Sequence, residues 1–205
     1  MLNIIFLVGL VVFALSSTYF HFTGKNKNSL NSAFLVSFIT LISYVLMWQG
    51  KITVATEAGQ PIFWTRWLFY LLSCTLLMVE IAKLKGIQGG ELVQLLYLTA
   101  IVMFTGYLAA RDLTAVKWVH FVISCAAYVL LVLKLLSVKA AASQWVNNYV
   151  FFGWTVFPIV FLLAPTGLGL IGAAVANLLY LVLDVYTKII FNIHLARTSV
   201  GTLTP

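Results

Sequence analysis

The stretch LDVYTK, residues 183–188, places an aspartate and a lysine four residues apart inside a long apolar segment, 169–196. A segment of this length can cross a bilayer as a helix, because about 20 helical residues span the hydrocarbon core. An ionisable side chain at the centre of such a helix costs about 2.5–3.5 kcal/mol. The i, i+4 spacing puts Asp184 and Lys188 on one face, so we expect both to point into the protein and to serve a structural or chemical purpose.

The composition extends this prediction to the whole chain. Of its 205 residues, 62% are hydrophobic and 8% are charged, and the mean hydropathy is +1.05, which is typical of a membrane protein. Seven apolar runs are long enough to span a bilayer: 2–22, 30–49, 62–82, 91–110, 115–137, 146–165 and 169–196. The sequence therefore predicts an all-α, seven-transmembrane helix bundle, formed by a single domain over residues 1–205 of a multi-pass protein of the cell membrane.

The basic residues predict the orientation. An extracellular N-terminus and a cytoplasmic C-terminus put more of them on the cytoplasmic side, as the positive-inside rule requires. Cytoplasmic segments then hold Lys25, Lys27, Lys83, Lys85, Lys134, Lys139 and Arg197, and extracellular ones hold Lys51, Arg111 and Lys117. The formal charge of +7 forms no patch or stripe along the sequence, so nucleic acid is not an expected partner.

Two connections carry recognisable turn signals. QGKITVATEAGQP, residues 49–61, alternates apolar and polar residues around a glycine and predicts a short extracellular hairpin. PTGLG, residues 165–169, predicts a tight turn that makes the last two helices antiparallel neighbours.

Neither the cysteines nor the histidines point to a disulfide or a metal site. Cys74 and Cys125 lie in apolar segments, which favours packing or pocket roles. His21, His120 and His194 lie near the ends of three different predicted helices without ligand spacing. A hydrolase or metal enzyme is therefore not expected.

Once the charges near the ends of the predicted spans are set aside, four ionisable residues remain inside them: Arg66, Glu80, Asp184 and Lys188. The last two can form a buried structural ion pair. Alternatively, desolvation favours the neutral amine of a buried lysine, and a neutral amine condenses with an aldehyde to form a Schiff base. A protonated Schiff base needs a nearby anion, which Asp184 can supply.

At this point the sequence resembles the microbial rhodopsins. LDVYTK matches the aspartate and retinal-bearing lysine of their seventh helix, WTVFPIVF at 154–161 resembles the aromatic and proline cage of their sixth, and RWLFYLLSCTLLMVE at 66–80 matches the arginine and functional signature of their third. The resemblance covers nearly the whole chain. It implies that Lys188 carries all-trans retinal as a protonated Schiff base, that Asp184 is the counterion, and that Arg66 helps to keep Asp184 ionised.

The resemblance also implies which side chains surround the chromophore. For any single aromatic residue, ordinary core packing remains the alternative. The matching pocket positions are Tyr70, Leu77, Trp154, Phe157, Pro158 and Phe161, with weaker matches at Tyr44, Thr105, Gly106, Ser124 and Cys125.

The third-helix signature bears on the direction of transport. Outward proton pumps of this family carry Asp, Thr, and Asp or Glu at three positions, which here are Phe69, Ser73 and Glu80. Phenylalanine can accept no proton, so the primary acceptor is missing. Positions where outward pumps carry release-group glutamates are Ala176 and Thr166 in this chain. The asymmetry favours proton release toward the cytoplasm, with uptake from the extracellular side.

Phe, Ser and Glu are also the signature of the schizorhodopsins, inward proton pumps associated with Asgard archaea, and Cys74 after Ser73 fits that group. Glu80 lies 14 residues beyond Arg66, about 21 Å along a helix, and shares a face with Ser73. A polar track through Ser73 and Cys74 to Glu80 is therefore expected, with Glu80 drawing the proton to the cytoplasm. The alternative is that Glu80 has no role in transport and that its carboxylate only extends from the helix end to the membrane–water interface.

Other functions remain open on these residues. Glu80 can act as the cytoplasmic donor of an outward pump, and a photosensor would signal through a partner within the membrane. A passive channel is disfavoured, because the spans carry no row of carboxylates. By resemblance alone, the protein is expected to form a homotrimer. The sequence does not indicate the absorption maximum or the extracellular proton donor.

Overall fold

The computed structural model describes residues 1–24, 31–50, 53–138 and 143–201, with side chains at 1–23, 31–50, 53–138 and 144–196. These residues form long helices and one short hairpin. The helices are α1 (Leu2–Gly24), α2 (Ser32–Gln49), α3 (Thr65–Lys85), α4 (Gly89–Arg111), α5 (Val116–Ser137), α6 (Ser143–Asn148), α7 (Thr155–Leu163), α8 (Ala173–Asp184) and α9 (Phe191–Gly201). The π-helices η1 (Tyr149–Trp154) and η2 (Val185–Ile190) join α6 to α7 and α8 to α9.

Within these ranges, seven continuous helical segments are long and apolar enough to span a membrane. The sixth span combines α6, η1 and α7, and the seventh combines α8, η2 and most of α9. The predicted seven-helix membrane bundle is confirmed. The third span begins at Thr65 instead of 62 because Pro61 and Ile62 form a strand, and the seventh begins at Ala173 because the preceding residues form a turn.

Both predicted connections are present. Strand β1 (Val54–Ala55) pairs antiparallel with β2 (Pro61–Ile62), which confirms the hairpin. In the turn between α7 and α8, the amides of Gly167 and Gly169 both donate to the carbonyl of Ala164. Gly169 has φ +69°, a left-handed conformation that glycine adopts without steric cost.

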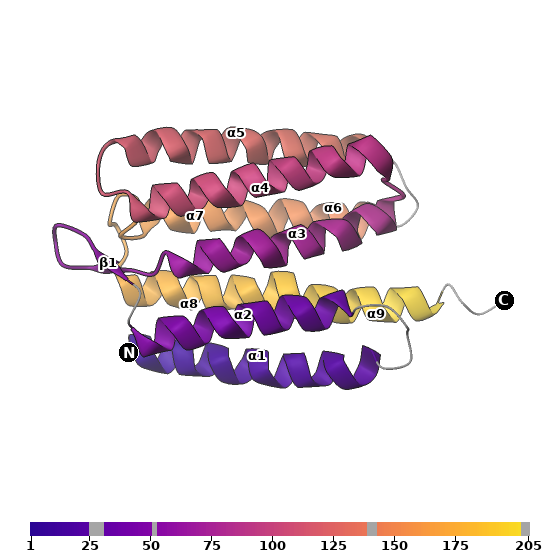
Figure 1. Cartoon of the computed structure of the whole chain (residues 1–205), viewed down its shortest axis with the longest axis horizontal. Helices are drawn as coiled ribbons and strands as arrows, with labels where there is room; N and C mark the ends of the chain where they lie inside the picture. Colours follow the sequence, from indigo (N-terminus) through magenta and orange to yellow (C-terminus); the bar gives the residue numbers. More distant parts are fainter. Residues whose placement is uncertain (25–30, 51–52, 139–142, 202–205) are drawn as a thin grey trace.

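The spans run side by side along the long axis of the molecule (Figure 1). The hairpin, the N-terminus and the α7–α8 turn lie at one end, here called the hairpin end; the C-terminus lies at the other, here called the opposite end (Figure 1). Consecutive helices from α1 to α5 pack on one another, and α8 contacts both α7 and α1. Lys83, Lys85 and Lys134 lie in the last turns of helices at the opposite end. Lys25, Lys27, Lys51, Lys139 and the side chain of Arg197 lie outside the described part.

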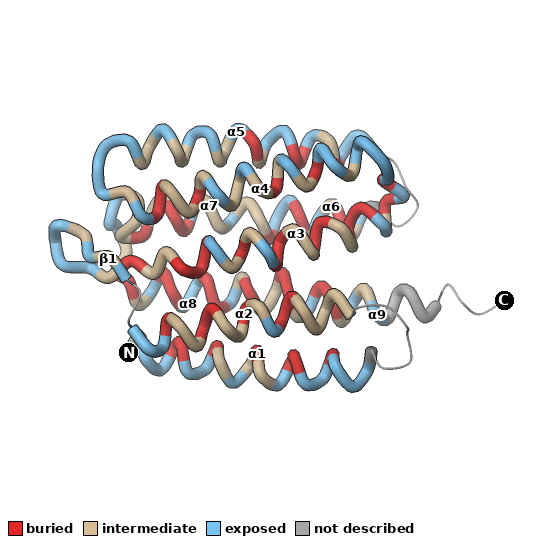
Figure 2. Tube along the Cα trace, viewed as in Figure 1, coloured by how far each residue is buried: buried red, intermediate tan, exposed pale blue. Residues whose placement is uncertain are grey.

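Buried residues face the centre of the bundle, whereas long stretches of α1 and α5 are exposed along their outer sides (Figure 2). Large apolar side chains remain exposed on these helices, among them Leu15, Val122 and Leu133. In a bilayer such a surface contacts lipid, so its exposure is consistent with the multi-pass membrane protein that the seven spans indicate.

Candidate functional site: a buried ion pair at an aromatic cavity

The centre of the bundle contains the ion pair that LDVYTK predicted. Lys188 Nζ lies 2.7 Å from Asp184 Oδ1, and the two side chains are 1% and 0% exposed. Asp184 ends α8 and Lys188 lies within η2, so both project from the same helical segment. A buried ion pair is maintained only when its remaining polar atoms are also satisfied.

Two tyrosine hydroxyls complete the surroundings of the carboxylate. Tyr70 Oη lies 2.7 Å from both oxygens of Asp184, and Tyr44 Oη donates to Oδ2 at 2.9 Å. The ring of Tyr44 packs against Gly9 of α1, where an added Cβ would overlap it. Lys188 Nζ also lies 3.5 Å from the centroid of the Tyr70 ring, a cation–π arrangement. Side chains from α2 and α3 thus hold Asp184 from both sides.

Local helix geometry sets the position of the lysine. In η2 the backbone is widened into a π-helix, a feature often found at functional sites. Asn192 Nδ2 donates a hydrogen bond to the carbonyl oxygen of Lys188 at 2.6 Å, and Thr187 Oγ1 donates one to the carbonyl oxygen of Leu183 at 2.7 Å. The second π-helix, η1, contacts η2 and leads into α7, where Pro158 removes a backbone donor. Both helices that meet at Lys188 are therefore irregular at that level.

An aromatic cavity adjoins the lysine on the side of α3, α4, α5 and α7. It is lined by side chains from all four of these helices and by Thr187 and Lys188 of η2. Aromatic and apolar side chains dominate its wall, and Lys188 is its ionisable amine. The wall consists of Trp67, Tyr70, Cys74, Val102, Met103, Gly106, Phe121, Ser124, Cys125, Tyr128, Trp154, Phe157, Pro158, Phe161, Thr187 and Lys188.

This cavity fits the group that the sequence resemblance implies. A polyene aldehyde is apolar along its length and reactive at one end, and the cavity offers an apolar wall with an amine at its edge. Phe121 and Phe161 are stacked, with centroids 5.0 Å apart, and Tyr70 and Phe157 meet edge to face at 5.7 Å. These ring contacts make the wall of the cavity aromatic and closely packed.

Most predicted pocket residues lie in this wall, but three lie elsewhere. Leu77 lines a smaller adjoining cavity on the side of the opposite end. Thr105 lies outside the wall and donates to the Ile101 carbonyl at 2.6 Å. Tyr44 contacts the ion pair instead of the cavity. Phe69 also lies outside the wall, partly buried one residue before Tyr70.

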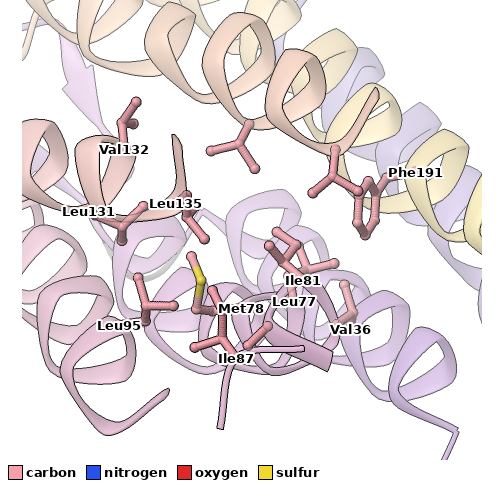
Figure 3. Packing of buried hydrophobic residues seen from close by; sticks show 13 residues of the cluster. Val36, Leu77, Met78, Ile81, Ile87, Leu95, Leu131, Val132, Leu135 and Phe191 are labelled. Carbon is pink, nitrogen blue, oxygen red and sulfur yellow. The ribbon is translucent and has the colours of Figure 1, made fainter. Parts of the chain in front are cut away.

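The predicted route from Ser73 to Glu80 crosses apolar side chains. Ser73 is fully buried, and its hydroxyl makes no hydrogen bond with the described residues. Leu77 and Ile81 follow on α3, and Figure 3 shows them beside Phe191 of α9. Glu80 lies three residues after Leu77 and directly before Ile81, with a 19% exposed side chain, and its Oε1 is 2.9 Å from Lys83 Nζ. In this structure the polar track is interrupted, so a proton needs water to enter this layer.

Arg66 lies toward the hairpin end from the ion pair. Its side chain is 2% exposed, and its guanidinium stacks on Tyr180 with 4.6 Å from Cζ to the ring centroid. A terminal nitrogen approaches Met47 Sδ at 3.5 Å. Among the described residues, no carboxylate lies within 4 Å of Arg66.

Several residues of the site were missed from the sequence. Trp67, Phe121, Tyr128 and Thr187 line the cavity, and Tyr180 supports Arg66. Helical spacing offered a signal for some of them, since Trp67 shares a face with Tyr70 and Cys74, and Tyr180 lies four residues before Asp184. That spacing also suits ordinary core residues, so it could not single them out.

Comparisons with known proteins agree with this geometry. The family model described as "Bacteriorhodopsin-like protein" matches residues 1–201. Bacteriorhodopsin of Halobacterium salinarum is 28% identical, with 93% of this chain and 81% of that protein covered. Sensory rhodopsin-2 of Haloarcula vallismortis is 27% identical over 76% of this chain and 70% of its own.

Solved structures give the same result. The crystal structure of schizorhodopsin 4 superposes with a TM-score of 0.89 at 38% identity, covering 97% of this chain and all of that one. Bromide-bound halorhodopsin from Halobacterium salinarum shares the fold, with a TM-score of 0.87 at 21% identity, covering 96% of this chain and 92% of that one. The family is one whose members bind retinal through a lysine. The chain therefore belongs to the bacteriorhodopsin-like family and is a microbial rhodopsin, similar to the schizorhodopsins.

Proposed function

We propose that this microbial rhodopsin is a light-driven inward proton pump that carries all-trans retinal on Lys188. Microbial rhodopsins transport ions in light or act as photosensors, and the proposal selects one direction and one ion. A single observation carries it: among the described residues, Asp184 is the carboxylate that pairs with Lys188. Phe69 occupies the position of α3 at which outward pumps of the family carry a second carboxylate, the proton acceptor.

The cavity residues would hold the chromophore. Trp154, Phe157, Pro158 and Phe161 of the sixth span form one wall, and Lys188 at the edge forms the covalent link. Bound retinal supplies light absorption and an isomerisation that reorients the nitrogen of Lys188. The protein supplies the charges that decide where the proton on that nitrogen goes.

Asp184 is poorly suited to take this proton. Its oxygens already accept from Tyr44, Tyr70 and Lys188, and donors of this kind stabilise the charged carboxylate. On loss of the contact with Asp184 the proton would lose that stabilisation, and Ser73 of α3, whose buried hydroxyl has no partner in the described structure, would offer a polar group toward the opposite end. Release toward the opposite end therefore competes well with return to Asp184.

Glu80 would draw the proton through the layer of Leu77 and Ile81. Its carboxylate and Lys83 reach the surface at the opposite end, so water can carry the proton away. We propose that this end is cytoplasmic and that the N-terminus is extracellular, as the positive-inside rule favours. Reprotonation from the extracellular side then completes an inward cycle.

The proposal is tested by illuminating retinal-supplied cells in unbuffered salt while recording the external pH. A rise that a protonophore abolishes is expected. A fall would mean an outward cycle with Glu80 as donor, and no change in a coloured protein would favour a photosensor.

Glu80→Gln should reduce the initial rate of this rise, because the carboxylate that attracts the proton is gone. Glu91→Gln is the matched control, since Glu91 lies at the same end, is exposed and pairs with Lys134 at 3.7 Å. Undiminished inward transport in Glu80→Gln would remove Glu80 from any essential role while leaving the direction intact.

A further inference from the structure

The buried charges at the centre of the bundle do not cancel. Arg66 and Lys188 carry two positive charges, and Asp184 carries one negative charge, so the group has a net charge of +1. The Asp184 carboxylate already accepts hydrogen bonds from Lys188 and from the hydroxyls of Tyr44 and Tyr70. Burying an uncompensated charge costs several kcal/mol, on the order of the penalty for each ion of a broken pair.

The remaining carboxylates of the chain do not compensate Arg66. Of the five Asp and Glu residues, Glu80 and Glu91 pair with lysines at the opposite end. Glu57 and Asp112 lie at the hairpin end, beside an open outer cavity that also contains Lys117. Asp112 accepts hydrogen bonds from Thr114, and neither carboxylate forms an ion pair with Arg66 in the described structure.

A separate inner cavity lies against the hairpin-end side of Arg66. It is bordered by Arg66, Asn177 and Tyr180. Two buried atoms in its wall residues, Arg66 Nε and Tyr180 Oη, have no hydrogen-bond partner in the described structure. Buried polar groups are normally satisfied, so this cavity offers unused donors next to the excess positive charge.

Helix α8 adds to the same field. Its first turn, from Ala173 to Asn177, forms part of the wall. The first amides of a helix lack internal partners, and the helix dipole makes this end positive. A guanidinium, a tyrosine hydroxyl and a helix N-terminus thus border one space, and all three favour an anion.

We propose that the inner cavity binds a small monovalent anion of the size of chloride, which neutralises Arg66. This anion lies on the far side of Arg66 from Lys188 and is a resident charge, not the transported ion. It enters through the outer cavity, because the two cavities share the wall residues Ile62, Pro165 and Thr166. The proposal does not depend on the direction in which protons move.

The binding test uses the purified protein with retinal, in sodium gluconate replaced stepwise by sodium chloride at constant ionic strength. Chloride is expected to shift the absorption maximum to shorter wavelength in a saturable way, because neutralising Arg66 lets Asp184 act more strongly on Lys188. The melting temperature should rise over the same concentrations, since a ligand of the folded state stabilises it. Equal spectra and equal melting temperatures in the two salts would overturn the proposal and leave water as the occupant.

Two charge variants locate the anion. Asn177→Asp places a carboxylate in the inner cavity and should abolish the chloride dependence, because the missing negative charge is then built in. Gln60→Glu is the matched control: it adds the same charge in the wall of the outer cavity alone and should keep the dependence. A chloride response that survives in both Asn177→Asp and Arg66→Gln would mean that the anion binds elsewhere.

Discussion

At the residue scale, the Asp184 carboxylate determines what Lys188 can do. It lies 2.7 Å from the lysine nitrogen and is fully buried, so little water screens the interaction. Tyr44 and Tyr70 fix its orientation from two other helices. Within the described structure, the positive charge on the lysine nitrogen is therefore paired with this one carboxylate.

Replacing Asp184 with Asn should move the absorption maximum markedly to longer wavelength, because the anion that stabilises the dark-state charge is removed. The visible spectrum of the purified pigment measures this. Asp112→Asn, at the hairpin end, should leave the spectrum in place. An unchanged spectrum in Asp184→Asn would contradict the counterion role.

At the scale of the elements, two irregular helices meet beside the aromatic cavity. Gly153 of η1 packs against η2, and an added Cβ would lie 2.9 Å from Thr187 Cγ2 and 3.1 Å from Tyr186 Cε1. The rings of Tyr149 and Tyr186 stack across the same interface, with centroids 4.6 Å apart. Trp154 and Lys188, which line the cavity, are the next residues in the chain after Gly153 and Thr187. The spacing between η1 and η2 therefore sets the shape of the cavity.

Gly153→Ala should lower the free energy of unfolding by about 1–3 kcal/mol, the usual cost of overpacking. Thermal bleaching of the visible band in detergent measures the loss. Gly90→Ala is the control, since a Cβ there meets nothing within 4 Å and alanine favours a helix by up to about 1 kcal/mol. Equal melting temperatures for the wild type and Gly153→Ala would show that η1 and η2 yield to the methyl group.

At the scale of the whole molecule, function depends on which end faces the cytoplasm. Glu80 and Lys83 reach the surface at the opposite end. Arg66, the inner cavity and the hairpin lie toward the hairpin end. The geometry of the bundle is the same in either orientation, but the transport vector reverses with it. The charge distribution along the chain favours an extracellular hairpin.

A membrane-impermeant maleimide should label Ala58→Cys, in the hairpin, on intact cells. It should label Gln88→Cys, at the opposite end, only after the cells are opened. Both positions are exposed, and the wild type measures the background from Cys74 and Cys125. Labelling of Gln88→Cys alone on intact cells would invert the orientation and make release at Glu80 outward.

The sequence by itself determined the seven spans, the hairpin, the turn before α8 and the Asp184–Lys188 pair. These features depend on apolar run length, turn residues and i, i+4 spacing, all of which are local. The aromatic and proline cage of 154–161 was also identified from one short stretch, and its three aromatic residues and Pro158 line the cavity.

The tertiary structure alone decided which distant side chains meet. Tyr44 and Asp184 are 140 positions apart in the chain, and the apolar cluster that contains Leu77 and Ile81 of α3 includes Phe191 from another helix. That Arg66 Nε has no hydrogen-bond partner among the described residues is likewise visible only once every neighbouring helix is in place. Helix periodicity tells which face a residue occupies, but the rotation and crossing of packed helices determine what that face contacts.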